Sequence, residues 1–250
     1  MSERIGGRVI RHDRVTSTMD EVAALAASGE PEGTVVVANE QTAGRGRSGR
    51  TWIGAPGAGL FCSILLRPKL APSYLQTLPL IVGVAVAEAL EAIAPIQCQL
   101  KWPNDVLIGG LKVAGILVTT RNLGSRLAWA ALGIGVNTSA TLNDLPDGAT
   151  SLVEASGKLV DRFTLESTLF VQLDYAYRAF VAANGQVTLE PWRSRAVHLQ
   201  EWVQVTTGDA SYDGRLAGVA DDGALLLSRD DGEIQRFTAG EIVHGPRRIA

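Results

Sequence analysis

The 250-residue sequence contains few cysteines, few aromatic residues and little excess charge, and each shortage narrows the possible classes of protein. Its two cysteines, Cys62 and Cys98, lie far apart and form no CxxC pair. This usage predicts two buried thiols in a reducing compartment rather than a disulfide framework. Aromatic residues make up 6% of the chain, so few side chains are available for stacking on nucleic-acid bases.

Long hydrophobic runs are also missing. The longest apolar stretch, Leu78 to Leu90, is too short to cross a bilayer and contains Gly83 and Glu88. No apolar run near Met1 has the form of a signal peptide. The formal net charge of −3 gives no general attraction to nucleic acid or membranes, so any anion site must be local. We therefore expect a cytoplasmic protein that binds neither DNA nor a membrane.

The spacing of apolar residues predicts an α+β protein in two parts. We expect helices over residues 17–29, 73–94, 163–184 and 191–197, and strands over 35–38, 60–66, 97–101, 106–108, 113–119 and 127–136. Residues 1–200 are predicted to form a catalytic domain, with a central mixed or antiparallel sheet flanked by helices.

The sequence pattern changes from about residue 201, where short apolar segments alternate with turn-forming residues. Short strands are expected at 202–206, 215–220, 224–228 and 234–238. Asp-Gly and Gly-Asp pairs favour tight turns between such strands. Residues 201–250 are therefore predicted to form a small antiparallel β-barrel, with turn signals at Gly208-Asp209, Asp213-Gly214, Asp222-Gly223 and Asp231-Gly232.

The most informative segment is rich in glycine and arginine and runs Gly44-Arg45-Gly46-Arg47-Ser48-Gly49-Arg50-Thr51-Trp52. Glycine allows crowded backbone conformations and loses extra entropy when it becomes ordered. Arginine presents a fixed fork of donors that suits phosphate and carboxylate groups. The segment is either a mobile loop that orders around an anionic ligand or a plain solvated basic loop.

A second cluster begins at Lys101-Trp102-Pro103-Asn104-Asp105 and extends to Lys112. The proline disfavours helix at the residue before it, and the Asn-Asp pair favours a turn. A hairpin through Gly109-Gly110 then places Lys112 at the mouth of a buried strand. A lysine there is costly to desolvate without an anionic partner, unless its stem covers the core while its ammonium group reaches solvent.

Together these clusters resemble the signature of the biotin protein ligases, which charge biotin with ATP and pass it to a lysine of a carrier domain. Ser17-Thr18, Gln41, the strand Ala114-Gly115-Ile116-Leu117 and the segment Gly133-Ile134-Gly135-Val136-Asn137 match in the same order. The resemblance covers nearly the whole chain. It implies a class II synthetase-like sheet and an SH3-like C-terminal barrel.

The resemblance also implies ligands and partners. Biotin and ATP are the expected substrates, Mg²⁺ the expected cofactor, and a biotin carboxyl carrier domain of a carboxylase the expected partner. Because the Ser17-Thr18 motif comes so early, the chain is expected to belong to the short class without an N-terminal DNA-binding domain. Both a monomer and a homodimer remain open.

For biotin, the resemblance implies contacts from residues of the first helix, the basic loop and the strand after Lys112. Ser17 and Thr18 also suit the cap of a helix, which is compatible with ligand contact. Met19 stands where the family often has asparagine, so we expect it to act through its backbone. The expected biotin contacts are Ser17, Thr18, Met19, Gln41, Arg45, Gly46, Arg47, Lys112 and Gly115.

For ATP and its adenylate, the implied contacts are Arg47, Arg50, Trp52, Asn104 and Asn137. The expected catalytic residues are Lys112, Arg45 and Asp105, with Lys112 holding the carboxylate of biotin beside the α-phosphate. Asp105 is a magnesium ligand, a proton acceptor or a turn carboxylate. Trp52 either covers the adenylate or packs in the core. Residues 44–51 are expected to order with the adenylate, and residues 139–150 to cover it.

Two other functions fit parts of the sequence. A lipoate–protein ligase shares the implied fold and chemistry but binds a substrate without a ureido group. A non-catalytic nucleic-acid-binding module would use the arginines to grip phosphates, but the acidic net charge and the scarcity of aromatics near those arginines oppose it.

Overall fold

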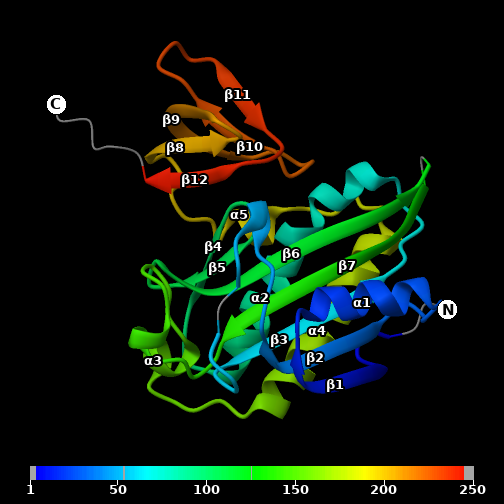
Figure 1. The fold of residues 1–250 in the computed structure, drawn as a ribbon. Coiled ribbons are helices and arrows are strands. Elements are labelled where there is room, and N and C mark those ends of the chain that lie inside the picture. The colour runs from blue at the N-terminus through cyan, green and yellow to red at the C-terminus, as the bar shows by residue number, and fades with distance from the viewer. Residues whose placement is uncertain (1–3, 53, 125, 245–250) are drawn as a thin grey trace.

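A seven-stranded mixed sheet forms the centre of the molecule in the computed structural model, which describes residues 4–52, 54–124 and 126–244 (Figure 1). The strand order is β1-β2-β3-β7-β6-β5-β4. β1 and β2 are parallel, and all other neighbouring pairs are antiparallel. The strands are β1 (Arg8–Val15), β2 (Thr34–Gln41), β3 (Gly59–Leu66), β4 (Cys98–Lys101), β5 (Asp105–Ile108), β6 (Leu111–Leu123) and β7 (Arg126–Asn137).

Helices cover both faces of this sheet because side chains along each strand alternate between the faces. On β2, Val36 packs with α1 (Thr18–Ala27), whereas Val35 and Val37 belong to the larger core on the other face. That face is covered by α2 (Leu78–Ile93) and α4 (Arg162–Ala182) (Figure 1). The remaining short elements are η1 (Arg47–Gly49), η2 (Pro72–Gln76), η3 (Leu142–Asp144), α3 (Leu152–Ser156) and α5 (Glu190–Arg193).

A second, five-stranded antiparallel sheet follows, in the order β11-β10-β9-β8-β12. Among its described strands, β11 and β12 are the two edges, so the pairing is that of an open sheet. It contacts the first sheet where Trp102 Nε1 donates to the carbonyl of Gly223 at 3.0 Å. Its strands are β8 (Trp202–Thr207), β9 (Ala210–Val219), β10 (Leu225–Ser228), β11 (Ile234–Phe237) and β12 (Glu241–His244).

Two predicted helices are shorter than expected. The helix expected over 73–94 is divided at Thr77 into η2 and α2, because Pro79 lacks an N–H group and fits only in the first turn of an α-helix. The helix expected over 191–197 is the single turn α5. Ala196, beyond it, is extended and forms a bridge with Leu100 at the end of β4.

The strand predictions contain one wrong turn and two omissions. Asp213-Gly214 does not form a turn but lies inside β9, opposite Val203 and Gln204 of β8. Gly214 is required there by close packing, since a Cβ atom would lie 2.6 Å from the carbonyl oxygen of Ser228. β1 and β12 were not predicted. Both are edge strands, β1 has a mostly polar sequence and β12 has only four residues.

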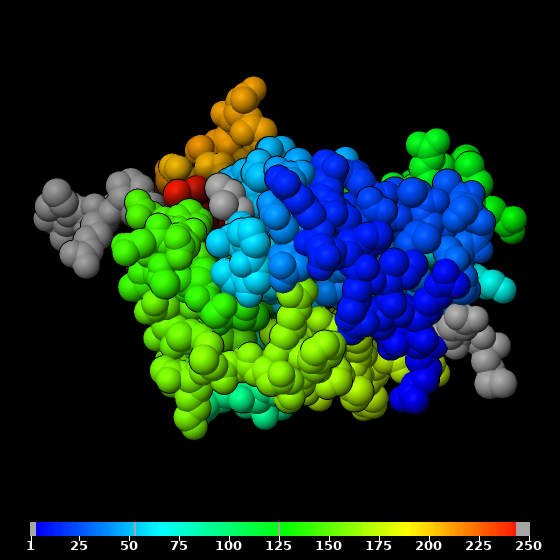
Figure 2. All heavy atoms as spheres, turned by 60° about the horizontal axis from the view of Figure 1, so that its bottom comes forward, coloured from blue at the N-terminus to red at the C-terminus, as the bar shows by residue number. Residues whose placement is uncertain are grey.

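The edge strand β1 is held by contacts with α4 that its local sequence does not reveal. On the face shown in Figure 2, the blue N-terminal residues lie beside the yellow-green residues of α4. Here Arg11 pairs with the buried carboxylate of Glu166 at 2.5 Å and lies over the ring of Phe163.

No helix within the described ranges is long and apolar enough to span a membrane.

Both cysteines are buried, as predicted, and we expect them to be chemically inert in the folded protein. Burial raises the pKa of Cys62 and of Cys98 to about 12, compared with 9.0 for an ordinary thiol. Because the thiolate is the reactive form, neither should react with Ellman's reagent at about pH 8 until the chain unfolds. Kinetics of thiol release with and without urea measure this. Rapid reaction in the folded state would contradict it.

Candidate active site

A cavity of about 170 Å³ lies between the start of α1, residues 44–52 and the sheet strands β3, β6 and β7. We call residues 44–52 the flap. Every predicted site residue except Asn137 lines this cavity, although these residues come from five separate parts of the chain. The lining members are Ser17, Thr18, Met19, Gln41, Arg45, Gly46, Arg47, Arg50, Trp52, Asn104, Asp105, Lys112 and Gly115.

One end of the cavity is a hydrogen-bonded polar cluster at the N-terminus of α1. Gln41 Oε1 accepts from the backbone N–H of Thr18 at 2.8 Å and lies 3.1 Å from its hydroxyl oxygen. That hydroxyl is also 2.7 Å from the hydroxyl of Ser63 on β3. Ser17 caps the helix by accepting from the N–H of Met19 at 3.3 Å. These fixed donors and acceptors suit a compact polar ring.

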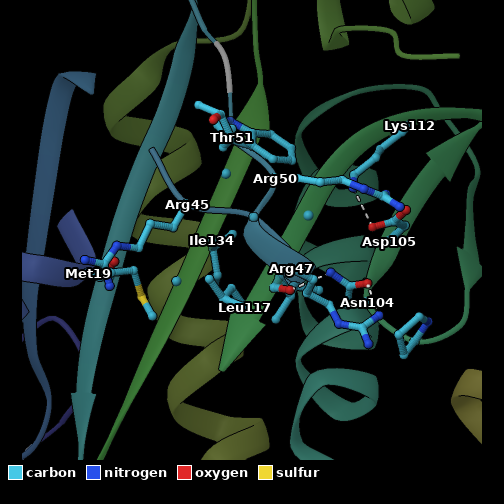
Figure 3. A pocket seen from close by; sticks show the side chains of 18 of the residues that line it. Met19, Arg45, Arg47, Arg50, Thr51, Asn104, Asp105, Lys112, Leu117 and Ile134 are labelled. Atoms are coloured by element: carbon cyan, nitrogen blue, oxygen red, sulfur yellow. Dashed lines mark hydrogen bonds and ion pairs between the residues drawn. The ribbon is translucent and has the colours of Figure 1, made fainter. Parts of the chain in front are cut away.

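The middle of the cavity is apolar and is shaped by glycine. The Met19 side chain lies over Gly133 of β7, where a Cβ atom would be 2.7 Å from its sulfur. Leu117 and Ile134 line the same region (Figure 3). Met19 therefore contributes its side chain to the cavity wall, in addition to any contact from its backbone.

Lys112 and Asp105 form the opposite end. Lys112 lies at the start of β6, and its Nζ is 2.6 Å from Asp105 Oδ1 on the neighbouring strand β5 (Figure 3). The ammonium group also lies 5.3 Å from the centre of the Trp52 ring. The lysine and aspartate side chains are 33% and 23% exposed, so an incoming ligand has access to both. The anionic partner that the position of Lys112 requires is thus Asp105.

The flap folds as a small hairpin over the cavity. Trp52 N–H donates to the Gly44 carbonyl at 2.9 Å, and Gly46 N–H to the Arg50 carbonyl at 2.7 Å. The Trp52 ring rests on Gly115 and Gly135, which lie opposite each other on β6 and β7. A Cβ atom on either glycine would be within 2.6 Å of the ring. Trp52 Nε1 is buried and has no hydrogen-bond partner within the described ranges.

The three arginines of the flap point in different directions. Arg45 reaches toward Met19 and α1, where it pairs with Asp20 at 2.5 Å (Figure 3). Arg47 donates to Asn104 Oδ1 at 3.4 Å and to the carbonyl of Gly240 at 3.1 Å. Burial lowers the pKa of Arg47, and the charges of Glu241 and Asp105 partly oppose this shift. Arg47 is therefore a poorly hydrated cation, which strengthens its attraction to anions.

Arg50 contacts the second sheet, where it forms an ion pair with Glu241 of β12. Together with the bond from Arg47 to the carbonyl of Gly240, this contact fastens the flap to the C-terminal sheet. Glu241 and Ile242 consequently line the cavity. The C-terminal sheet is therefore part of the site wall.

Asn137 is the one predicted site residue that lies outside the cavity lining. It is 5% exposed, and its Nδ2 donates to the carbonyl of Thr150 at 3.0 Å. The segment 139–150 is further held because Lys112 N–H donates to the Gly148 carbonyl and Thr150 N–H donates to the Lys112 carbonyl. Asn137 thus anchors the segment predicted to cover the adenylate, and its contact with adenine stays a prediction.

Sequence reasoning did not identify several lining residues. Ser63 lies in a strand of apolar residues, and its alternation with buried neighbours gives no hint of a polar partner. Glu241 lies 191 residues beyond Arg50 of the flap, so only the docking of the two sheets reveals it. Lys101 was recognised as a strand end but was not assigned to the site that it lines.

Comparisons with known proteins agree with this arrangement. Residues 11–137 match the biotin/lipoate A/B protein ligase family, and residues 198–245 match the biotin protein ligase C-terminal domain. The chain is 35% identical to the bifunctional ligase/repressor BirA of Bacillus subtilis, over 98% of this chain and 76% of that protein. It is 33% identical to the biotin–[acetyl-CoA-carboxylase] ligase of Paracoccus denitrificans, over 93% of this chain and 98% of the relative.

A solved structure shows the same architecture. The biotin protein ligase from Aquifex aeolicus, determined in complex with biotin and ATP, superposes with a TM-score of 0.82. The two chains are 32% identical, and the match covers 95% of this chain and 98% of that one.

The packing of Trp52 on Gly135 allows a test of whether this side chain anchors the flap. In Gly135→Ala the new methyl group displaces the ring, and trypsin should cleave after Arg47 and Arg50 about tenfold faster, the factor for roughly 1.4 kcal/mol of lost packing. Gly83→Ala in α2 is the matched control, because its methyl group would make only ordinary contacts with the side chains of Leu100 and Ile116. Mass spectrometry of the fragments locates the cuts. Equal cleavage rates in the two variants would show that Trp52 does not anchor the flap.

Proposed function

Because the chain belongs to the biotin/lipoate A/B protein ligase family, we propose that its cavity joins biotin to ATP and then transfers biotin to a lysine of a biotin carboxyl carrier domain. The observation that carries this proposal is the cavity itself, which has a polar cluster at one end and a cation at the other under a single arginine-rich flap. Biotin has a polar ureido ring, an apolar body and tail, and a terminal carboxylate, in the same order.

The cavity supports one orientation of biotin. The ureido ring pairs with the cluster of Ser17, Thr18 and Gln41, which offers both donors and acceptors. The thioether ring and the aliphatic tail lie along Met19 and its apolar neighbours. The carboxylate then lies toward Lys112. The distance between the polar cluster and this ammonium group thereby selects an acid with a polar head and a tail of fixed length.

In the first reaction, an oxygen of the biotin carboxylate attacks the α-phosphorus of ATP. The bond from the α-phosphorus to the bridging oxygen breaks, and pyrophosphate leaves with that oxygen and its electron pair. Both reactants are anions, so a cation between them lowers the barrier. Lys112 is suited to this role because its side chain lines the cavity and is one-third exposed, so its ammonium group is accessible to a ligand oxygen. Arg47 supplies a second positive charge.

Mg²⁺ bound to the phosphates would offset their charge, and it needs oxygen ligands. The described part of the chain contains no group of three or more metal-binding side chains. Mg²⁺ is commonly held by one or two carboxylates together with phosphates and water, and Asp105 fits that requirement. We therefore propose Asp105 as the protein's contribution to this site.

In the second reaction, the amine of the carrier lysine attacks the acyl carbon of biotinyl-adenylate, and AMP leaves. The amine must lose a proton, and Asp105 is the carboxylate at the cavity best placed to receive it. The mixed anhydride is sensitive to water, so the flap must stay closed between the two steps. Trp52, whose buried N–H has no partner among the residues that the structure describes, is suited to covering the adenylate and donating to it.

Biotin-dependent exchange of labelled pyrophosphate into ATP tests the first reaction, and labelling of a carrier domain tests the second. Lipoate in place of biotin is the discriminating arm, because lipoate lacks the ureido group that the polar cluster would bind. Exchange supported by lipoate and not by biotin would overturn the proposal. RNA binding with a steep salt dependence and no use of ATP would also overturn it.

Lys112→Ala should lower the rate of pyrophosphate exchange by about 10²–10³, the usual effect of removing one donor that stabilises transition-state charge. Lys158→Ala removes an exposed lysine away from the cavity and serves as the matched control. Thermal unfolding of both variants shows whether the fold is retained. Undiminished exchange by a folded Lys112→Ala variant would remove this lysine from the mechanism.

Biotin and ATP together should protect the flap from trypsin, because contacts with the bound substrates add to the Trp52 packing and the ion pairs that already hold it. Cleavage after Arg45, Arg47 and Arg50 should be slower with both substrates than in the free protein. Cleavage elsewhere in the chain is the internal reference. Equal flap cleavage in the free and liganded proteins would be the contrary result.

A further inference from the structure

We propose that Asp20 is a positioning residue that fastens the flap to α1 through Arg45 and so slows the release of bound biotin. This inference rests on the proposed function, because it concerns the cavity in which biotin would bind. Asp20 does not line that cavity, and none of the contacts argued above gives it a part in the chemistry.

The geometry of α1 leaves Asp20 free for this role. Asp20 is the third residue of the helix, a position from which an acidic side chain often turns back to cap the helix start. Here Ser17 provides the side-chain cap, and the carboxylate of Asp20 instead points outward to Arg45 at 2.5 Å. The neighbouring Glu21 has no recorded ion pair among the described residues.

The flap is held at two corners, and the Asp20–Arg45 pair is one of them. Arg45 lies opposite Thr51 in the flap hairpin, so fixing its side chain fixes both arms of the hairpin. The far corner is tied to the C-terminal sheet through Arg50 and Glu241. The near corner is tied to the helix whose first residues form the polar end of the cavity. Loss of the Asp20–Arg45 pair leaves the flap attached to the rest of the protein through the Arg50–Glu241 pair.

The pair acts when phosphate is not there to hold the flap. Before ATP binds and after pyrophosphate leaves, the arginines of the flap have fewer anionic ligands to hold it closed. Asp20 belongs to the protein and remains in place throughout. Its side chain is 38% exposed and that of Arg45 is 55% exposed. An ion pair with this exposure contributes up to about 1 kcal/mol, which corresponds to a factor of about two to five in a rate.

The test measures how fast tritiated biotin dissociates from the full-length protein after a chase with unlabelled biotin. Asp20→Asn should release biotin about two to five times faster than the wild type, which is the effect of one exposed ion pair. Glu21→Gln is the matched control, because it removes the same charge from the same first turn and leaves Arg45 paired. Asp20→Glu, which retains the charge, should restore at least part of the slow release.

Salt and a double variant separate this role from a general loss of structure. Because salt screens exposed charges, raising KCl from about 0.05 to about 0.5 M should speed release from the wild type more than from Asp20→Asn, in which, of the two ion pairs described for the flap, only the Arg50–Glu241 pair is left to screen. In the Arg45→Ala background, Asp20→Asn should have no further effect. Equal release from Asp20→Asn and Glu21→Gln, or additive effects of the Asp20 and Arg45 changes, would overturn the inference. If the wild type fails to bind biotin, the proposed function fails instead.

Discussion

The site depends on the contact between Lys112 and Asp105 beneath Trp52. A lysine at the start of a buried strand would be costly without a counter-charge, and the β4–β5–β6 arrangement supplies one from the neighbouring strand. The same lysine carries the segment 139–150 through both of its backbone hydrogen-bonding groups. The start of β6 therefore holds the ammonium group beside its counter-charge on β5 and also anchors the segment 139–150.

The sequence was sufficient to predict what depends on local pattern. The hairpin through Gly109-Gly110 and the strand after Lys112 follow from turn chemistry and from an uninterrupted apolar run. The resemblance identified the other predicted site residues, because its motifs are short and occur in a fixed order. Boundaries such as the break at Thr77 were missed because a single proline decides them, and edge strands such as β1 because their apolar pattern is weak.

The partners of the flap arginines were beyond prediction for a different reason. Arg45, Arg47 and Arg50 are chemically alike and lie within six residues, yet they pair with α1, with the β4–β5 turn and with β12. The partner of Arg50 depends on how the two sheets dock, which distant contacts such as that of Trp102 with Gly223 help to set. The partners of the other two depend on how the flap lies over α1 and the β4–β5 turn. A cluster of arginines predicts that an anion will be bound. It does not predict which acidic or polar side chain of the protein pairs with each arginine when no anionic ligand is present.

Three glycines, Gly115, Gly133 and Gly135, remove side chains from adjoining positions on two neighbouring strands. The side chains of Trp52 and Met19 therefore lie directly against the backbone of the sheet at these glycines. A floor made of backbone has no rotamers with which to adjust. The depth at which Trp52 and Met19 sit is consequently fixed by hydrogen-bonded strand geometry, which repacking of neighbouring side chains leaves unchanged.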